Sequence, residues 1–132
     1  LAEPIKSGAA VMTTVAQVAQ DVPPSAGERR LYEKGLNQIE AGNFEQARLS
    51  LQTLINVYPR SPLRQDARSA IRTSWIRQGI ENPDPMLLFQ EGQRRAAGGK
   101  HEAARLAYQT VINLYPSSAY AGKARQALRE IE

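Results

Sequence analysis

The sequence is short of the residues on which most catalytic and metal sites depend. Its 132 residues include no cysteine, which excludes disulfides, thiolate metal sites and cysteine nucleophiles. His101 is the only histidine, and the chain has neither a glycine-rich phosphate loop nor carboxylates and histidines at metal-ligand spacing. We therefore expect a protein that is not an enzyme and that uses no metal and no cofactor.

Long hydrophobic runs are missing as well. No apolar stretch approaches the roughly 18–20 residues that a membrane-spanning helix needs. A charged segment followed by an apolar one, typical of a secretory signal, is also lacking, so we expect any signal to have been removed upstream of Leu1. The composition, 42% hydrophobic and 23% charged with a net charge of +4, is ordinary for a folded domain.

What the sequence does contain is an internal repeat. QTLINVYPRSP at 52–62 returns 57 residues later as QTVINLYPSSA at 109–119. Aligned without a gap, residues 31–71 and 88–128 are identical at 17 of 41 positions. The chain therefore contains two copies of one supersecondary unit.

Capping residues and apolar spacing predict six helices and no strand. Ser25 and Glu28 form a capping-box pattern, the glycines suit helix ends, and Asp84-Pro85 is typical of a helix start. The helices are expected to begin after Ser25, after Asn43 (with Gln46), after Ser61, after Asp84, after Gly99, and after Ser117 or Ser118. They are expected to end near Gly42, Tyr58, Gln78, Gly98, Tyr115 and the last residue. Each Tyr-Pro pair thus marks the end of one helix and the approach to the next.

These residues resemble the tetratricopeptide repeat. The family pattern falls on Gly35, Gly42, Phe44, Ala47, Leu51 and Pro59, and again on Gly92, Gly99, His101, Ala104, Tyr108 and Pro116. The resemblance implies an all-α fold, an open right-handed arch of about six helices over residues 25–132, with copies at 28–79 and 85–132. His101 stands where the family has an aromatic residue, so we expect it to serve packing or the turn.

The spacing departs from the family pattern. A standard repeat has about 34 residues, whereas the two copies lie 57 residues apart. The helix expected to begin after Ser61 resembles the first helix of a middle repeat whose second helix is missing. Such a short array is expected to form an open arch in place of a continuous superhelical groove.

The stretch AGNFEQARLSLQTLINVYPRSPLRQDARSAI at 41–71 resembles, more narrowly, repeats of bacterial envelope proteins. The two kinds that it resembles are the outer-membrane barrel-assembly lipoprotein and the periplasmic coordinator associated with the Tol–Pal system. This resemblance implies a periplasmic or cell-envelope location. One version of that location has the protein anchored to the outer membrane through an N-terminal part that has been removed.

The family resemblance also implies where partners bind, which is the inner face of the first helix of each repeat. These positions are Arg29, Tyr32, Leu36, Ile39 and Glu40 in the first copy, and Met86, Phe89, Gln93, Ala96 and Ala97 in the second. Taken together they predict one apolar partner-binding groove with an exposed aromatic residue. The alternative is that Leu36, Ile39 and Phe89 only pack on neighbouring helices.

A row of arginines forms a second candidate site. Its members are Arg60, Arg64, Arg68 and Arg72, spaced every four residues, with Arg77 near the helix end and Arg125 and Arg129 in the second copy. Like charges at this spacing repel, so helix stability does not account for the row. It could dock an acidic protein surface or anionic lipid headgroups, or it could be a solvated face relieved by nearby carboxylates. Nucleic acid fits less well, because the net charge is modest and no aromatic residues interleave with the row.

Residues 1–24 differ from the rest. Val11, Val15, Val18 and Val22 form an apolar stripe, and Pro23-Pro24 separates it from the repeats. This segment could fold back on its own domain, lie along a partner as an arm, or be a linker.

These observations together predict a non-catalytic scaffold for protein–protein interaction. We expect an accessory subunit of a membrane-associated assembly in the bacterial envelope. Two alternatives remain: a homo-oligomer that covers an apolar face by self-association, and a basic adaptor for anionic lipid or nucleic acid.

Overall fold

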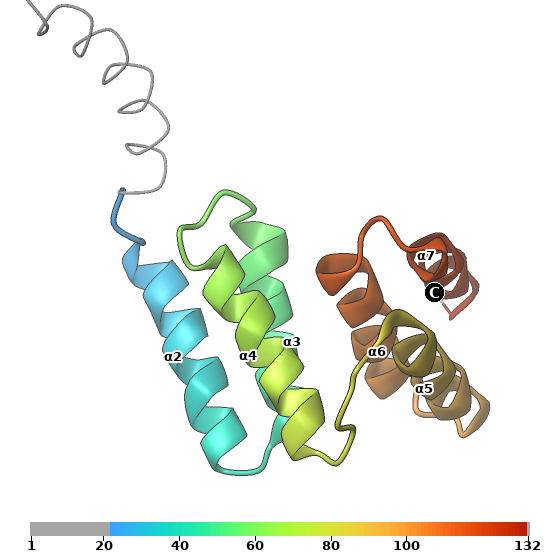
Figure 1. Cartoon of the computed structure of the whole chain (residues 1–132). Helices are drawn as coiled ribbons and strands as arrows, with labels where there is room; N and C mark the ends of the chain where they lie inside the picture. The colour runs from blue at the N-terminus through green and yellow to red at the C-terminus, as the bar shows by residue number, and fades with distance from the viewer. Residues whose placement is uncertain (1–21, 132) are drawn as a thin grey trace, which may run out of the picture.

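Six helices account for most of the computed structural model, which describes residues 22–131 (Figure 1). They are α2 (Ala26–Glu40), α3 (Phe44–Val57), α4 (Arg64–Arg77), α5 (Pro85–Ala97), α6 (His101–Leu114) and α7 (Ala119–Ile131). The described range contains no strand. The predicted all-α fold is thus confirmed, while Val11, Val15 and Val18 lie outside the described residues.

Several helix ends form as their sequences predict. The Ser25 hydroxyl accepts a hydrogen bond from the Glu28 amide at 3.1 Å, and the Glu28 carboxylate accepts one from the Ser25 amide. Asp84 caps α5 by accepting from the Leu87 amide at 2.8 Å, with Pro85 in the first turn. Gly42 and Gly99 follow α2 and α5 with φ of 78° and 77°, a conformation that residues with a Cβ rarely adopt.

Other boundaries differ from the prediction. Helix α4 begins at Arg64, because residues 61–63 form a turn in which the Ser61 hydroxyl accepts from the Leu63 amide at 3.1 Å. Asn43 precedes α3 but makes no side-chain capping bond. Its amide instead donates to the Gln38 carbonyl at 2.8 Å, which closes the end of α2 with backbone groups alone.

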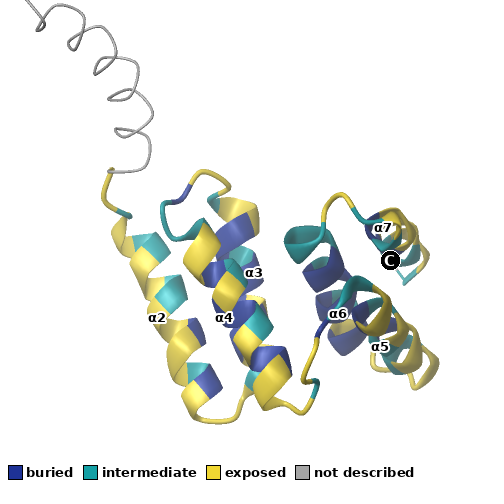
Figure 2. Cartoon of the chain, in the orientation of Figure 1, coloured by how far each residue is buried: buried dark blue, intermediate teal, exposed yellow. Residues whose placement is uncertain are grey.

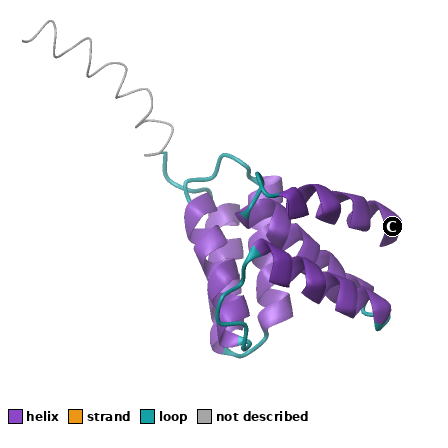
Figure 3. Ribbon diagram, turned by 45° about the vertical axis from the view of Figure 1, so that its right-hand side comes forward, coloured by secondary structure: helices purple, strands orange, loops and turns teal. Residues whose placement is uncertain are grey.

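The helices form two groups of three, α2–α4 and α5–α7, and α3 and α6 pack against each other between the groups (Figure 1). The backbone of helix α2 approaches none of α5, α6 and α7 closely. The helices of the second group run obliquely to those of the first (Figure 3). Only residues 78–84 connect α4 to α5, so the second helix of a middle repeat is missing, as the 57-residue spacing predicts.

The core runs through both groups. Buried residues gather on the inward sides of α3, α4 and α6, while α2 and α5 expose most of their surface (Figure 2). Large buried apolar side chains include Leu51, Ile55, Ile71, Trp75 and Val111. Burial of such side chains is the main source of stability in a fold of this kind.

Candidate partner-binding grooves

The first candidate site is the α2–α4 groove, a cleft of about 440 Å³ between those two helices. It is lined by Tyr32, Leu36, Asn37, Ile39, Glu40, Asp66, Ser69, Ala70, Thr73 and Arg77. Ile39 and Ala70 are buried at its floor, whereas Leu36 remains exposed. Arg77 and Glu40 form an ion pair at 3.0 Å, where the C-terminal ends of α4 and α2 meet.

The second candidate site is the α5–α7 groove, with a volume of about 390 Å³. It is lined by Phe89, Gln93, Ala96, Tyr108, Lys123, Gln126, Ala127 and Glu130. Apart from Tyr108, each of these residues stands 57 positions after a residue that lines the α2–α4 groove. The repeat therefore builds the same cleft twice.

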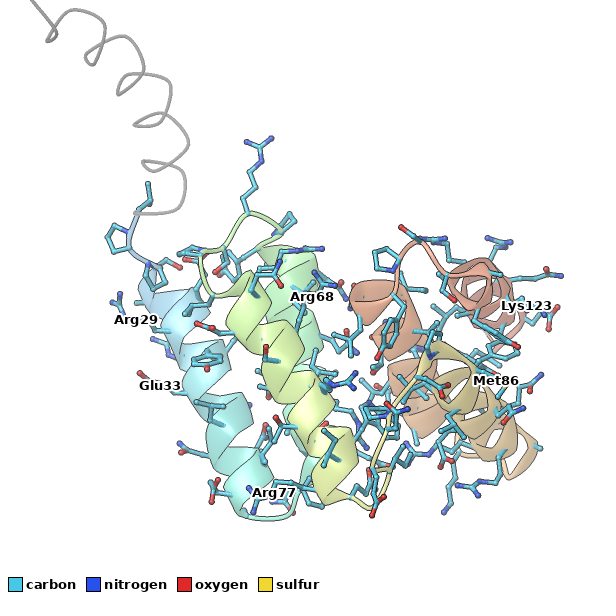
Figure 4. All side chains as sticks on the ribbon, viewed as in Figure 1. Arg29, Glu33, Arg68, Arg77, Met86 and Lys123 are labelled. Carbon is cyan, nitrogen blue, oxygen red and sulfur yellow. The ribbon has the colours of Figure 1, made fainter. Side chains whose placement is uncertain are left out.

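The chemistry of the two grooves is not the same. Leu36 of the first groove is replaced by Gln93 in the second, and Asp66 is replaced by Lys123. The α2–α4 groove thus combines an exposed apolar side chain with the Asp66 carboxylate. The α5–α7 groove presents the Gln93 amide, the Lys123 ammonium group and the Glu130 carboxylate. Figure 4 labels Lys123 on α7 and Arg77 at the end of α4.

Aromatic side chains form part of each groove. The ring of Phe89 lies 5.6 Å from that of Tyr108 and 5.7 Å from that of Tyr120, a spacing typical of favourable aromatic packing. Burial, with a smaller contribution from Asp66, raises the pKa of Tyr32. Burial and then Glu130 raise the pKa of Tyr108. Both phenols therefore remain neutral across physiological pH and can donate hydrogen bonds to a ligand.

Seven of the ten predicted groove residues line a groove. They are Tyr32, Leu36, Ile39 and Glu40 in the first groove and Phe89, Gln93 and Ala96 in the second. The structure divides them between two clefts, where the sequence analysis expected one, because α3 and α6 stand between α2 and α5.

The remaining three lie elsewhere. Arg29 donates a hydrogen bond from its guanidinium to the Pro24 carbonyl at 2.5 Å, and Met86 and Ala97 are exposed outside the α5–α7 groove. The prediction also left out the walls formed by α4 and α7, including Asp66 and Lys123. It assigned binding only to the first helix of each copy, although the copies match at positions in the third helix as well.

The arginine row is divided by its own contacts. Arg60 lies in the turn before α4, and Arg64 donates to the Pro59 carbonyl at 3.5 Å. Arg68 donates to the Leu114 carbonyl at 3.1 Å, and Arg72 donates to the Tyr115 hydroxyl. Figure 4 shows Arg68 on the side of α4 toward the second group of helices.

The row is therefore not one free strip. Its two central members join the halves of the molecule, and Arg77 is paired with Glu40. Arg60, Arg77, Arg125 and Arg129 are the exposed members, and of these Arg77 is the one paired with a carboxylate in the described range.

A buried cationic cluster was not predicted from the sequence. The Arg48 guanidinium lies 3.6 Å from the centre of the Trp75 ring and donates to Ser74 at 3.0 Å and to Gln78 at 2.6 Å. The Arg95 guanidinium lies 4.7 Å from the same ring centre. Burial, and then the charge of Arg95, lower the pKa of Arg48 to about 9. The cluster brings α3, α4 and α5 together. The single tryptophan marks it in the sequence, but the sequence does not show which arginines lie beside that ring.

Within 22–131 no group of three or more histidine, aspartate or glutamate side chains is arranged to hold a metal ion. None of the helices in that range has the length and apolar character to span a bilayer. His101 is the first residue of α6 and is exposed, so it belongs to the turn and does not pack in the core.

The family model described as "Tetratricopeptide repeat" matches residues 31–61 and 87–118. These ranges cover α2 with α3 and α5 with α6, the same pairs that the internal repeat superimposes. Two segments of the chain are therefore similar to tetratricopeptide repeats. No curated protein and no solved structure matches the chain.

Each segment that matches the tetratricopeptide repeat model is followed by one additional helix. Helices α4 and α7 lie after the two matched ranges, and each forms a wall of one groove. In longer arrays the first helix of the next repeat would occupy this place. The unit that recurs here is thus a repeat plus a half-repeat, which explains the 57-residue period.

Proposed function

We propose that this protein is a non-catalytic scaffold that binds segments of other proteins in its two grooves. The observation that carries the proposal is the α2–α4 groove, where Leu36 is exposed beside Tyr32 and a buried apolar floor. Tetratricopeptide repeats generally bind other proteins, and a cleft with apolar contacts and a few placed polar groups is the usual form of such a site.

The charges of each groove define what it accepts. In the α2–α4 groove Asp66 favours a ligand that carries a basic group beside its apolar anchor. In the α5–α7 groove Lys123 and Glu130 offer one charge of each sign, which favours a polar ligand over one of a single charge. The two grooves therefore favour different partner segments, and a scaffold can hold both segments at once.

The proposed setting is a membrane-associated complex of the bacterial envelope, in which this protein is an accessory subunit. Its support is the sequence resemblance of residues 41–71 to repeats of bacterial envelope proteins. A periplasmic location follows from the same resemblance, and anchoring to the outer membrane through a part of the protein before residue 22 is one form of it.

The test is affinity purification of tagged wild-type protein from gently solubilised native membranes, in parallel with two variants. Leu36→Glu places a charge in the α2–α4 groove, and we expect it to lose most of the co-purifying envelope proteins. Leu87→Glu is the matched control, because Leu87 is also an exposed leucine, on α5, but lines neither groove. Loss of the same proteins with both variants, or with neither, would contradict binding in the groove. Recovery of proteins from outside the envelope would contradict the location alone.

A further inference from the structure

The hydrogen bonds that join the two halves fall on one face of α6, beside the contacts that Arg95 of α5 makes with Glu45 and Trp75. We name this face of α6 the α6 docking face, and it consists of Leu106, Thr110, Asn113, Leu114 and Tyr115. At its centre the Thr110 hydroxyl accepts hydrogen bonds from the Gln52 side-chain amide at 3.0 Å and the Trp75 indole at 3.2 Å. At its end Arg68 donates to the Leu114 carbonyl at 3.1 Å.

Two further bonds complete this contact. Arg72 donates to the Tyr115 hydroxyl, and the Asn113 amide donates to the side-chain oxygen of Gln52. Thr110 and Leu106 are buried as a result.

The same face occurs a second time. Within the described residues no side chain of another helix hydrogen-bonds to it, although the Tyr58 hydroxyl lies beside Gly27 of α2. Shifted by 57 positions, it becomes the free α3 face, which consists of Leu49, Thr53, Asn56, Val57 and Tyr58. Four of its five residues are identical to those of the α6 docking face, and the fifth replaces leucine by valine. Leu49 is 42% exposed and Val57 60% exposed, values that leave two apolar side chains in water.

The side chains that fill the α6 docking face are also repeated. Gln52, Arg68 and Arg72 recur as Gln109, Arg125 and Arg129, which we name the donor face. Both arginines of the donor face are exposed, and neither lines the α5–α7 groove. Each molecule thus presents the free α3 face on one side and, on α6 and α7, the donor face whose side chains match it.

We propose that the donor face of one molecule binds the free α3 face of a second copy, by the contact that already joins the two halves within the chain. In this contact Gln109 pairs with Thr53 and Asn56 of the next molecule. Arg125 reaches the Val57 carbonyl, and Arg129 reaches the Tyr58 hydroxyl. The two surfaces are different, so the contact is head to tail and adds copies in a row unless the rotation closes a ring.

This assembly is expected to be weaker than the internal contact. The indole of Trp75 has its counterpart at Glu132, which lies outside the described residues and carries no ring. The partner-binding grooves lie on other surfaces, so the inference goes beyond the proposed function and is compatible with it.

The N-terminal segment is the competing occupant of the free α3 face. Val11, Val15 and Val18 stand 57 positions before Arg68, Arg72 and Trp75, the residues of α4 that contact α6. If this segment covers the α3 face within its own chain, a second copy cannot dock. The donor arginines favour the second copy, because they match the internal contact in charge and hydrogen bonding whereas valines do not.

The test is sedimentation velocity of the full chain from low micromolar to millimolar concentration. We expect the wild-type average mass to rise with concentration. We expect Val57→Lys, which places a positive charge beside the donor arginines, and Arg129→Glu each to remain monomeric throughout. An equimolar mixture of these two variants should form a one-to-one dimer and nothing larger, because each supplies the face that the other lacks. Leu87→Glu should assemble like the wild type, and so should Leu36→Glu, which separates this result from any failure of groove binding. Circular dichroism of each variant checks that its helices are intact.

Two outcomes would overturn the proposal. In the first, the mixture of variants stays monomeric while the wild type assembles, which means that another surface is used. In the second, the wild type stays monomeric at every concentration. A Val57→Cys variant then identifies the reason, since the chain has no other cysteine. Slow thiol modification would assign the face to the N-terminal segment, and fast modification would show it to be free.

Discussion

Thr53 and Thr110 are the same residue at the same repeat position, yet their surroundings differ. Both hydroxyls donate to the carbonyl four residues earlier, at 2.7 Å and 2.8 Å. Only Thr110 is fully buried, and only its oxygen also accepts bonds from Gln52 and Trp75. The two environments differ because the fold places the donors Gln52 and Trp75 beside Thr110 and, within the described residues, places no such donors beside Thr53.

Substitution of Thr110 by valine is therefore expected to destabilise the protein. Thr110→Val preserves the shape of the side chain but leaves the Trp75 indole N–H and one amide N–H of Gln52 buried without an acceptor. Each such group costs about 1–3 kcal/mol, so we expect the free energy of unfolding to fall by about 2 kcal/mol or more. Denaturant unfolding at a concentration where the protein is monomeric measures this change. Thr53→Val is the control and should alter stability by less than about 0.5 kcal/mol; equal losses for both variants would contradict the role assigned to Thr110.

At the scale of the helix pair, one glycine in each repeat sets how closely the first two helices approach. A Cβ added to Gly35 would lie 2.6 Å from the Leu51 side chain, and one added to Gly92 would lie 2.5 Å from the Tyr108 ring. These separations are far below van der Waals contact. Helix α2 therefore rests on Leu51, and helix α5 on Tyr108, only because no side chain intervenes.

Alanine at Gly35 is expected to force α2 away from α3. Overpacking of this kind typically costs about 1–3 kcal/mol, which outweighs the gain of about 1 kcal/mol that alanine brings to a helix interior. Gly122→Ala in α7 is the control. It measures the gain in helix stability alone, because nothing lies within 4 Å of the added Cβ. Thermal unfolding should show a lower midpoint for Gly35→Ala and an unchanged or higher one for Gly122→Ala. Stabilisation by both substitutions would show that the α2–α3 approach is not limited by Gly35.

Across the whole molecule, Arg95 links the two halves. From α5 its guanidinium reaches the Trp75 ring and lies 3.5 Å from the Glu45 carboxylate of α3. Glu91 holds Arg95 in place with a bond of 3.1 Å and also binds Arg94. Burial alone would raise the pKa of Glu91, but its bonds to Arg94 and Arg95 outweigh that effect and hold the pKa below the ordinary value of 4.5.

The lowered pKa of Glu91 predicts a pH-dependent contribution to stability. A carboxyl whose pKa is lower in the folded than in the unfolded state stabilises the fold above its unfolded pKa, and this contribution is lost as pH falls through the folded pKa. Glu91→Gln should therefore lower the free energy of unfolding by about 1.5–3 kcal/mol at pH 7, the range for hydrogen bonds to charged groups. The difference from wild type should shrink below about pH 4.5.

Urea unfolding of both proteins between pH 3 and pH 8 measures this difference. Glu33 on α2 offers a control, because it is exposed and makes no ion pair in the described range. Glu33→Gln should change stability little at any of these pH values. A gap between wild type and Glu91→Gln that stays constant down to pH 3 would contradict the assignment.

Features carried by neighbouring residues were predicted well. The capping box at Ser25, the caps and proline at the start of α5, and the glycine ends of α2 and α5 depend only on a few consecutive residues, so the sequence shows them directly. The predicted start of α4 was wrong by two residues, because Ser61 and Pro62 can form a turn as readily as a helical first turn. The groove positions of α2 and α5 were predictable because each repeats after 57 residues on a helix with a recognisable family pattern.

The sequence by itself determined that this protein is built from two copies of an all-α repeat, since periodicity, capping and glycine placement are local properties of the chain. Only the tertiary structure decided that the copies pack through α3 and α6, which divides the predicted groove into two. It also decided that Arg68 and Arg72 serve the internal contact while the identical Arg125 and Arg129 remain exposed. The reason is physical: a repeat sequence specifies identical surfaces, and burial of a surface depends on which neighbour lies beside it in space.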